Sequence, residues 1–121
     1  MTVIPSFLLK RMYAMGSLRL VPEGVAFDII NNLGPGLISK LNGISFNGKL
    51  FGPKEVMLVV DGEKIEGERV TEDSPAHFNL HQTVTCIIKT ALDPGTYEMT
   101  LDLVSKEAGR VTLTVQDQLA A

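Results

Sequence analysis

The stretch 92–115 constrains what this 121-residue chain can fold into more than any other part of the sequence. After the turn at Pro94 and Gly95, every second residue is apolar, and the same alternation returns from Val111 to Val115. The apolar members of the first run are Tyr97, Met99, Leu101 and Leu103. Because a period of two is the pattern of a strand buried on one face, the stretch predicts two antiparallel strands.

The entry into the first of these strands, Asp93-Pro94-Gly95-Thr96-Tyr97, resembles the tyrosine corner of immunoglobulin-like sandwiches. In such a corner a Tyr at the start of the penultimate strand donates its hydroxyl to backbone a few residues upstream. Tyr97, Gly95 and Pro94 are therefore predicted structural residues. Together with the patterns described next, they predict an all-β fold, a two-sheet antiparallel sandwich that is immunoglobulin-like or related, with about seven to nine short strands.

Turn chemistry separates the remaining strands. Asn47-Gly48 is the strongest two-residue hairpin signal, since both positions of its tight turn need positive φ, and Asp61-Gly62 is a second such pair. The predicted strands around these and other turns are 17–21, 25–31, 44–46, 49–51, 56–60, 64–65 and 83–90. The glycines and proline of 32–36 interrupt the pattern, and the polar segment 66–75 predicts a long loop or a ragged edge strand.

Composition predicts one folded domain, with 45% hydrophobic and 21% charged residues. The net charge of -3 and the scattered lysines and arginines form no basic stripe, which argues against nucleic acid or an anionic membrane as partner. No apolar run reaches the ~20 residues of a membrane span, and Lys10 and Arg11 stand where a signal peptide stays apolar. These features predict a cytoplasmic protein.

A mean hydropathy of +0.18 is high for a monomer of this size and predicts that a partner covers apolar surface. Residues 1–15 form an apolar arm, helical or extended, that packs on the domain or on a partner, and residues 16–121 form the sandwich. The candidate interface residues are Phe7, Leu8, Leu9, Met12, Tyr13, Leu50, Phe51, Met57 and Val59. Met57 and Val59 belong to a strand that is apolar on both faces; a one-residue error in strand parity places part of this set inside the core.

Residues that carry chemistry are sparse, and we expect no catalytic, metal or cofactor site. His77 and His81 have i, i+4 spacing, but the surrounding sequence favours loop and strand, where these positions lie about 13 Å apart. The carboxylates of Glu63, Glu66, Glu68, Glu72 and Asp73 match no calcium loop and are expected on a solvated surface. Cys86, in an apolar strand pattern, is expected to be a buried thiol.

Six short segments, distributed over most of the chain, resemble the small β-subunit of bacterial C-glycoside deglycosidases and related short proteins. They are Ile4–Lys10, Gly16–Arg19 with Gly24–Phe27, Asn32–Gly36, Val59–Glu63 and Asp93–Tyr97. The resemblance implies a β-sandwich that supports a larger, barrel-shaped subunit, which holds the metal and the catalytic groups. No catalytic residue of this chain follows from it.

The leading hypothesis is a non-catalytic accessory or assembly subunit of a larger enzyme complex, bound to a larger protein or to copies of itself. The alternative is a small-ligand or carbohydrate-binding β-sandwich module. Carbohydrate modules present exposed aromatic rings, whereas this chain has no Trp and only two tyrosines. An independent enzyme ranks third, with Glu72, His77 and His81 as its only plausible residues.

Overall fold

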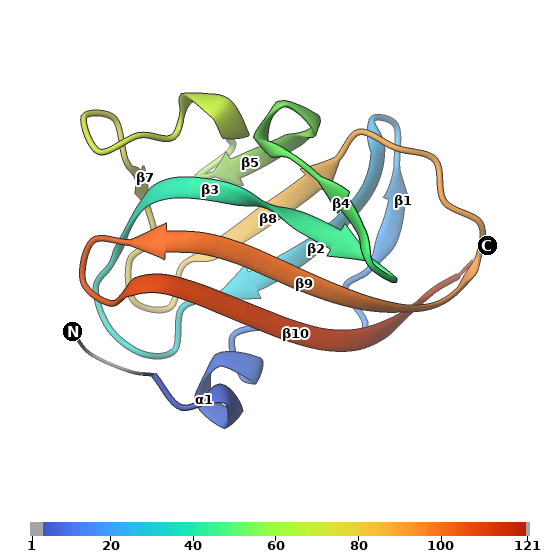
Figure 1. Ribbon diagram of the computed structural model, residues 1–121, viewed down its shortest axis with the longest axis horizontal. Coiled ribbons are helices and arrows are strands. Elements are labelled where there is room, and N and C mark those ends of the chain that lie inside the picture. The colour runs from blue at the N-terminus through green and yellow to red at the C-terminus, as the bar shows by residue number, and fades with distance from the viewer. Residues whose placement is uncertain (1–3, 121) are drawn as a thin grey trace.

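Ten strands form two antiparallel sheets in the computed structural model, which describes residues 4–120 (Figure 1). The first sheet has the order β1 (Arg19–Val21), β2 (Gly24–Ile30), β8 (Thr83–Ile88), β5 (Val56–Val60) and β6 (Glu63–Glu66). The second has the order β10 (Gly109–Leu119), β9 (Gly95–Ser105), β3 (Leu37–Phe46) and β4 (Lys49–Phe51), with β7 (Ala76–His77) paired to the start of β3. The predicted two-sheet sandwich is confirmed.

Short helical segments complete the described chain. The helix α1 (Ser6–Lys10) lies beyond the β10 edge of the second sheet, and two 3₁₀ turns, η1 (Pro53–Glu55) and η2 (Gly67–Arg69), flank β5 and β6 (Figure 1). No helix within residues 4–120 is long and apolar enough to span a membrane.

The turns form as their residues predict. Asn47 and Gly48 have φ of 50° and 87°, and Asp61 and Gly62 have φ of 51° and 79°, the positive values that a tight hairpin requires. The Tyr97 hydroxyl donates to the backbone carbonyl of Asp93 at 2.6 Å, which confirms the predicted bond to upstream backbone.

The first half of β3 was absent from the predicted strands because two irregularities break its period. The register of β3 against β9 shifts between Ile38 and Lys40 and again between Leu41 and Gly43. As a result the buried residues of this part of β3 are three positions apart instead of two: Ile38, Leu41 and Ile44. Gly43 has φ of 151°, and a Cβ there would lie 2.7 Å from the Phe51 carbonyl oxygen, so a glycine is needed at the second bulge.

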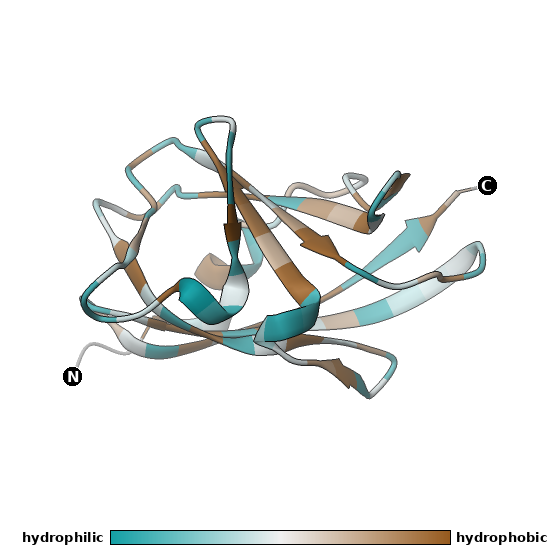
Figure 2. Ribbon diagram, turned by 90° about the horizontal axis from the view of Figure 1, so that it is seen from above, coloured by the Kyte–Doolittle hydropathy of each residue, from teal (hydrophilic) through white to brown (hydrophobic). Residues whose placement is uncertain are grey.

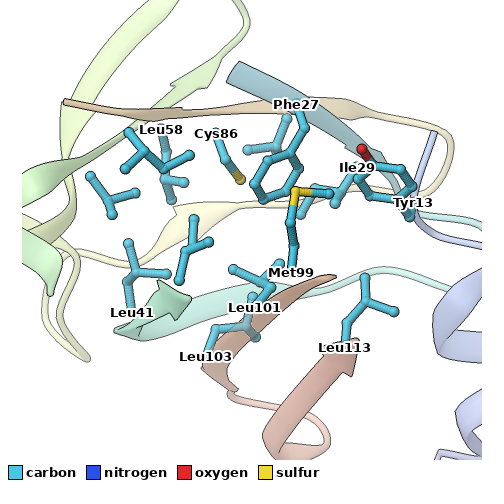
Figure 3. Close-up of a cluster of buried hydrophobic side chains, with 14 of the residues drawn as sticks. Tyr13, Phe27, Ile29, Leu41, Leu58, Cys86, Met99, Leu101, Leu103 and Leu113 are labelled. Atoms are coloured by element: carbon cyan, nitrogen blue, oxygen red, sulfur yellow. The ribbon is translucent and has the colours of Figure 1, made fainter. Parts of the chain in front are cut away.

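The core lies between the facing sheets. Apolar and polar residues alternate along the strands, visible as brown and teal segments in Figure 2. Phe27, Leu58 and Cys86 from the first sheet face Met99 and Leu101 from the second (Figure 3). Burial in this layer raises the pKa of the Cys86 thiol to about 12, so the cysteine is an inert hydrophobic side chain, as expected.

The outer faces correct one part of the sequence analysis. Phe51 pairs with Ile44 and is buried beside Phe46, so it belongs to the core and does not point away from it. Neighbouring residues of a strand point to opposite faces, so of the pair only Leu50 points outward, and it is 65% exposed. Met57 and Val59 have the predicted outward parity and are half-buried.

Candidate apolar binding site

The helix α1 depends on the sandwich for its stability. Five residues are too few for a helix to persist in water, and its N-cap residue Pro5 makes no side-chain capping bond. Its buried residue is Leu9, and the helix packs against β10. The packing of Leu9 and the chain that follows α1 therefore determine where the helix lies.

The residues after α1 join the first sheet. The Ile30 amide donates to the Met12 carbonyl at 2.7 Å, the Ala14 amide donates to the Asp28 carbonyl at 3.0 Å, and Tyr13 forms an isolated bridge with Ile29. The segment 12–14 thus lies along the free edge of β2, and the Tyr13 ring packs against Phe27 with 5.6 Å between centroids.

The same segment is fixed to the second sheet by Asp117. This carboxylate accepts hydrogen bonds from the Tyr13 hydroxyl at 2.6 Å and from the Gly16 amide at 2.9 Å, and a longer one from the Leu18 amide. Burial raises the pKa of Asp117, but these bonds outweigh it and hold the pKa below its ordinary value. A charged anchor therefore closes the gap between β2 and β10 at this point.

Beneath α1, further along the same gap, the molecule is hollow. The hollow has a volume of about 410 Å³, within the range of small-molecule sites, and is partly open to solvent. Its floor is the core itself: Ile29 belongs to the first sheet, and Leu101, Leu103 and Leu113 belong to the second (Figure 3). The hollow is therefore an unfilled part of the space between the two sheets.

The hollow is lined by apolar groups apart from three side chains. One of these, Asn31, lies between β2 and the loop that the glycines and proline of 32–36 form. Its amide nitrogen donates to the carbonyls of Gly34 and Phe78, and its oxygen accepts from the amides of Leu33 and Gly34. Asn31 thus holds the loop in place and has no capacity left for a ligand.

The other two polar side chains, Ser105 and Glu107, lie at the β9–β10 turn. Ser105 accepts from the amides of Glu107 and Ala108 and donates to Oε1 of Glu107. The Leu37 amide donates to the same Oε1 at 3.0 Å, and this bond holds the pKa of Glu107 below its ordinary value. An ionised carboxylate therefore stands at the mouth, and it is the one charged side chain that lines the hollow within residues 4–120.

Two exposed apolar residues lie on segments that contribute to the lining of the hollow. Leu33 lines it and is 40% exposed, and Phe7, on α1 beside the lining residue Leu8, is 61% exposed. Exposed side chains of this size near an apolar opening are a common feature of binding sites.

The predicted interface residues divide into three groups. Three are buried within the domain: Leu9, Tyr13 and Phe51. Four are half-buried, namely Leu8, Met12, Met57 and Val59, and two are exposed, Phe7 and Leu50. Of the arm residues, Leu8, Leu9 and Met12 line the hollow. Residues 4–15 of the arm therefore pack on their own sandwich and leave space beneath them, whereas residues 1–3 of the predicted arm lie outside the described residues.

The candidate metal ligands do not come together. His77 is in β7 and His81 is in the turn before β8, and both are exposed. Among residues 4–120 no group of three or more His, Cys, Asp or Glu side chains is placed to hold a metal ion. Of the predicted surface carboxylates, Glu66 pairs with Lys89 at 2.9 Å across the outer face of the first sheet.

Asp117 and the hollow were missed by the sequence analysis. Asp117 had a signal: the alternation Leu113, Val115, Asp117, Leu119 places a carboxylate on the inward face of a strand, where it needs partners. No sequence signal marked the hollow, because its lining comes from separate segments. Its size depends on how much space these segments leave between them.

Comparison with known proteins assigns the family. Residues 8–120 match the family described as hydroxymethylglutaryl-CoA reductase, N-terminal domain. No curated protein sequence matches the chain. The match includes β1 to β10 and most of α1, so it covers both sheets and most of the hollow's lining. The chain belongs to the family of hydroxymethylglutaryl-CoA reductase N-terminal domains.

Proposed function

We propose that this chain is a non-catalytic binding domain that takes an apolar ligand into the hollow beneath α1. The observation that carries the proposal is the floor of the hollow, where core residues of both sheets border a space of about 410 Å³. Sandwich interiors are normally close-packed, so an unfilled apolar space open to solvent favours a guest molecule.

The test uses a ligand without a polar end, so that only the hollow matters. Hexane at saturation should raise the melting temperature of the wild-type protein by about 2–4 °C, because a ligand that binds only the folded state stabilises it. Val111→Phe, which puts a ring into the hollow, should abolish the increase. Val115→Phe is the matched control, since Val115 has the same inward parity on β10 but does not line the hollow.

A second candidate function is that of an accessory domain bound to a larger protein. It is favoured by Phe7, whose ring is 61% exposed on α1, and by the family description, which concerns a domain of a reductase. The resemblance to the small subunit of C-glycoside deglycosidases implies the same kind of role and stays a prediction. We carry over no reductase activity or substrate to this chain.

The accessory function predicts that Phe7 lies in a contact with another chain. Tagged wild-type protein should co-purify from its host with one larger protein in a fixed ratio, and Phe7→Glu should lose that protein. Leu50→Glu is the control, because Leu50 is equally exposed but lies on β4 and does not line the hollow. Equal capture by Phe7→Glu, or none by the wild type, contradicts this candidate. Conversion of a wild-type dimer to monomers by Phe7→Glu would favour self-association instead.

A further inference from the structure

We infer that the ligand of the hollow is a slender apolar chain whose one polar end donates a hydrogen bond, as in a primary alcohol or an alkylammonium, and is not a free carboxylic acid. The inference rests on the proposed function and adds the chemical class of the ligand. Three properties of the site support it: its lining, its shape and the charge at its mouth.

The lining excludes polar groups along the buried part of the ligand. Asn31 and Ser105 have their hydrogen bonds to backbone and to Glu107, and within residues 4–120 no buried side-chain nitrogen or oxygen lacks a partner. A hydroxyl or amide carried into the hollow would find no buried side-chain partner left free for it and would lose its bonds to water. The inserted part of the ligand is therefore hydrocarbon.

The shape favours a narrow molecule. The hollow lies between two packed sheets, whose backbones are about 10 Å apart in a sandwich, so side chains from both layers leave a slot and not a sphere. The volume of the hollow is about 410 Å³. If each methylene group takes the ~30 Å³ of a water molecule, and part of the space stays open to solvent, the hollow holds roughly ten methylene groups. A chain of about ten carbons fits both limits.

The charge at the mouth selects the polar end. Oε1 of Glu107 accepts from the Leu37 amide and the Ser105 hydroxyl, whereas Oε2 has no hydrogen bond within residues 4–120. A carboxylate with an open oxygen accepts a hydrogen bond from a hydroxyl or an ammonium and repels a second carboxylate. Lys106 precedes Glu107 on the turn but does not line the hollow.

The experiment compares three ten-carbon ligands by calorimetric titration at pH 7: 1-decanol, decylammonium and decanoate. The wild-type protein should bind decanol and decylammonium at one per chain and decanoate at least about threefold more weakly. Shortening decanol to octanol should weaken binding about tenfold, because two methylene groups leave the hollow.

The variant Glu107→Gln separates charge from shape. It keeps an acceptor oxygen but removes the charge. Compared with the wild-type protein, the variant should therefore bind decanoate about threefold to tenfold more tightly and decylammonium about threefold to tenfold more weakly. Its affinity for decanol should stay within about twofold of the wild-type value. Glu98→Gln, an exposed carboxylate at the opposite end of β9, is the matched control and should change none of the three.

The outcomes are distinguishable. If decanoate binds the wild type as tightly as decanol, or if Glu107→Gln leaves the order unchanged, the ligand class is wrong while the hollow remains a binding site. If hexane raises the melting temperature but none of the three ten-carbon ligands binds, the slender-chain class is overturned. If neither hexane nor any chain binds, the proposed function itself fails.

Discussion

The gap between the two sheets is closed in two different ways along the β10 side. Near the C-terminal end of β10, Tyr13 and Leu18 fill it, and Asp117 ties the segment 13–18 to the sheet through three donors. Near the N-terminal end, α1 lies over Val111 and Leu113 and leaves the space beneath it empty. One strand thus borders a filled half and an open half of the same gap.

The two halves hold the chain by different kinds of contact. The filled half combines a buried aromatic ring with hydrogen bonds to an ionised carboxylate, and such bonds are about twice as strong as neutral ones. The open half has a five-residue helix without a side-chain cap and one buried helical residue, Leu9. Hydrogen bonds to a carboxylate therefore fix the chain in the filled half, whereas the packing of Leu9 holds α1 over the open half.

The largest expected effect comes from Tyr13→Ala in the filled half. It removes a ring that is 6% exposed and leaves Asp117 without its strongest donor, so the free energy of unfolding should fall by about 3–5 kcal/mol. Leu8→Ala in the open half should cost only about 1 kcal/mol, because Leu8 is half-buried and faces the hollow. Urea unfolding measures both; equal costs would remove the distinction between the halves.

The second-largest effect is expected when a larger side chain is placed in each half, because the cost in stability should differ between the two halves. Val115→Phe inserts a ring on the inward face of β10 where Val115 packs against the core and borders no part of the hollow, and we expect it to destabilise the protein by about 1–3 kcal/mol. Val111→Phe inserts the same ring beside the hollow and should change stability by no more than about 0.5 kcal/mol. The comparison by urea unfolding fails if both variants lose the same stability.

Asp117→Asn should cost about 1–2 kcal/mol at pH 7, since it weakens hydrogen bonds that a charged acceptor receives. Because the pKa of Asp117 is lowered in the folded state, its contribution is present above the ordinary carboxyl pKa of about 3.9 and is lost as the pH falls through the folded value. The difference between wild type and variant should therefore shrink below about pH 4. A difference that stays constant from pH 7 to pH 3 argues against the charged anchor.

The smallest effect is expected from Tyr97→Phe. The bond from its hydroxyl to the Asp93 carbonyl is exposed, so water replaces it and the cost should be about 0.5–1 kcal/mol. Tyr13→Phe serves as the comparison and should cost more, because its hydroxyl bonds a partly buried carboxylate. If thermal unfolding shows the larger loss for Tyr97→Phe, the tyrosine corner and not Asp117 is the stronger constraint.

The parts of this fold that the sequence predicts are those marked by a local pattern. The strands β9 and β10 and the turns at Asn47-Gly48 and Asp61-Gly62 follow from alternation and from positive φ, which depend on neighbouring residues only. The first half of β3 does not, since its two bulges change the spacing of buried residues from two to three. A sequence pattern with period two cannot detect such a strand.

The site was less predictable for a physical reason. The apolar arm and the outward parity of Met57 and Val59 follow from composition and pairing, but Phe51 was assigned to the wrong face because the parity of β4 depends on its register with β3. The hollow arises where α1, the loop around Asn31 and the β9–β10 turn fail to fill the space between the sheets. No local sequence pattern marks a space that lies between segments far apart in the chain.

The most direct test of the central claim, that the open half is a binding site, is a methyl NMR titration with 1-decanol. The methyl resonances of Val111, Leu113 and Leu8 should shift and saturate at one ligand per chain, because these side chains line the hollow. Those of Val115 and Leu18, which do not line the hollow, should stay within the line width. Unchanged Val111 and Leu113 resonances at saturating decanol, or equal shifts at Val115 and Leu18, would contradict the account.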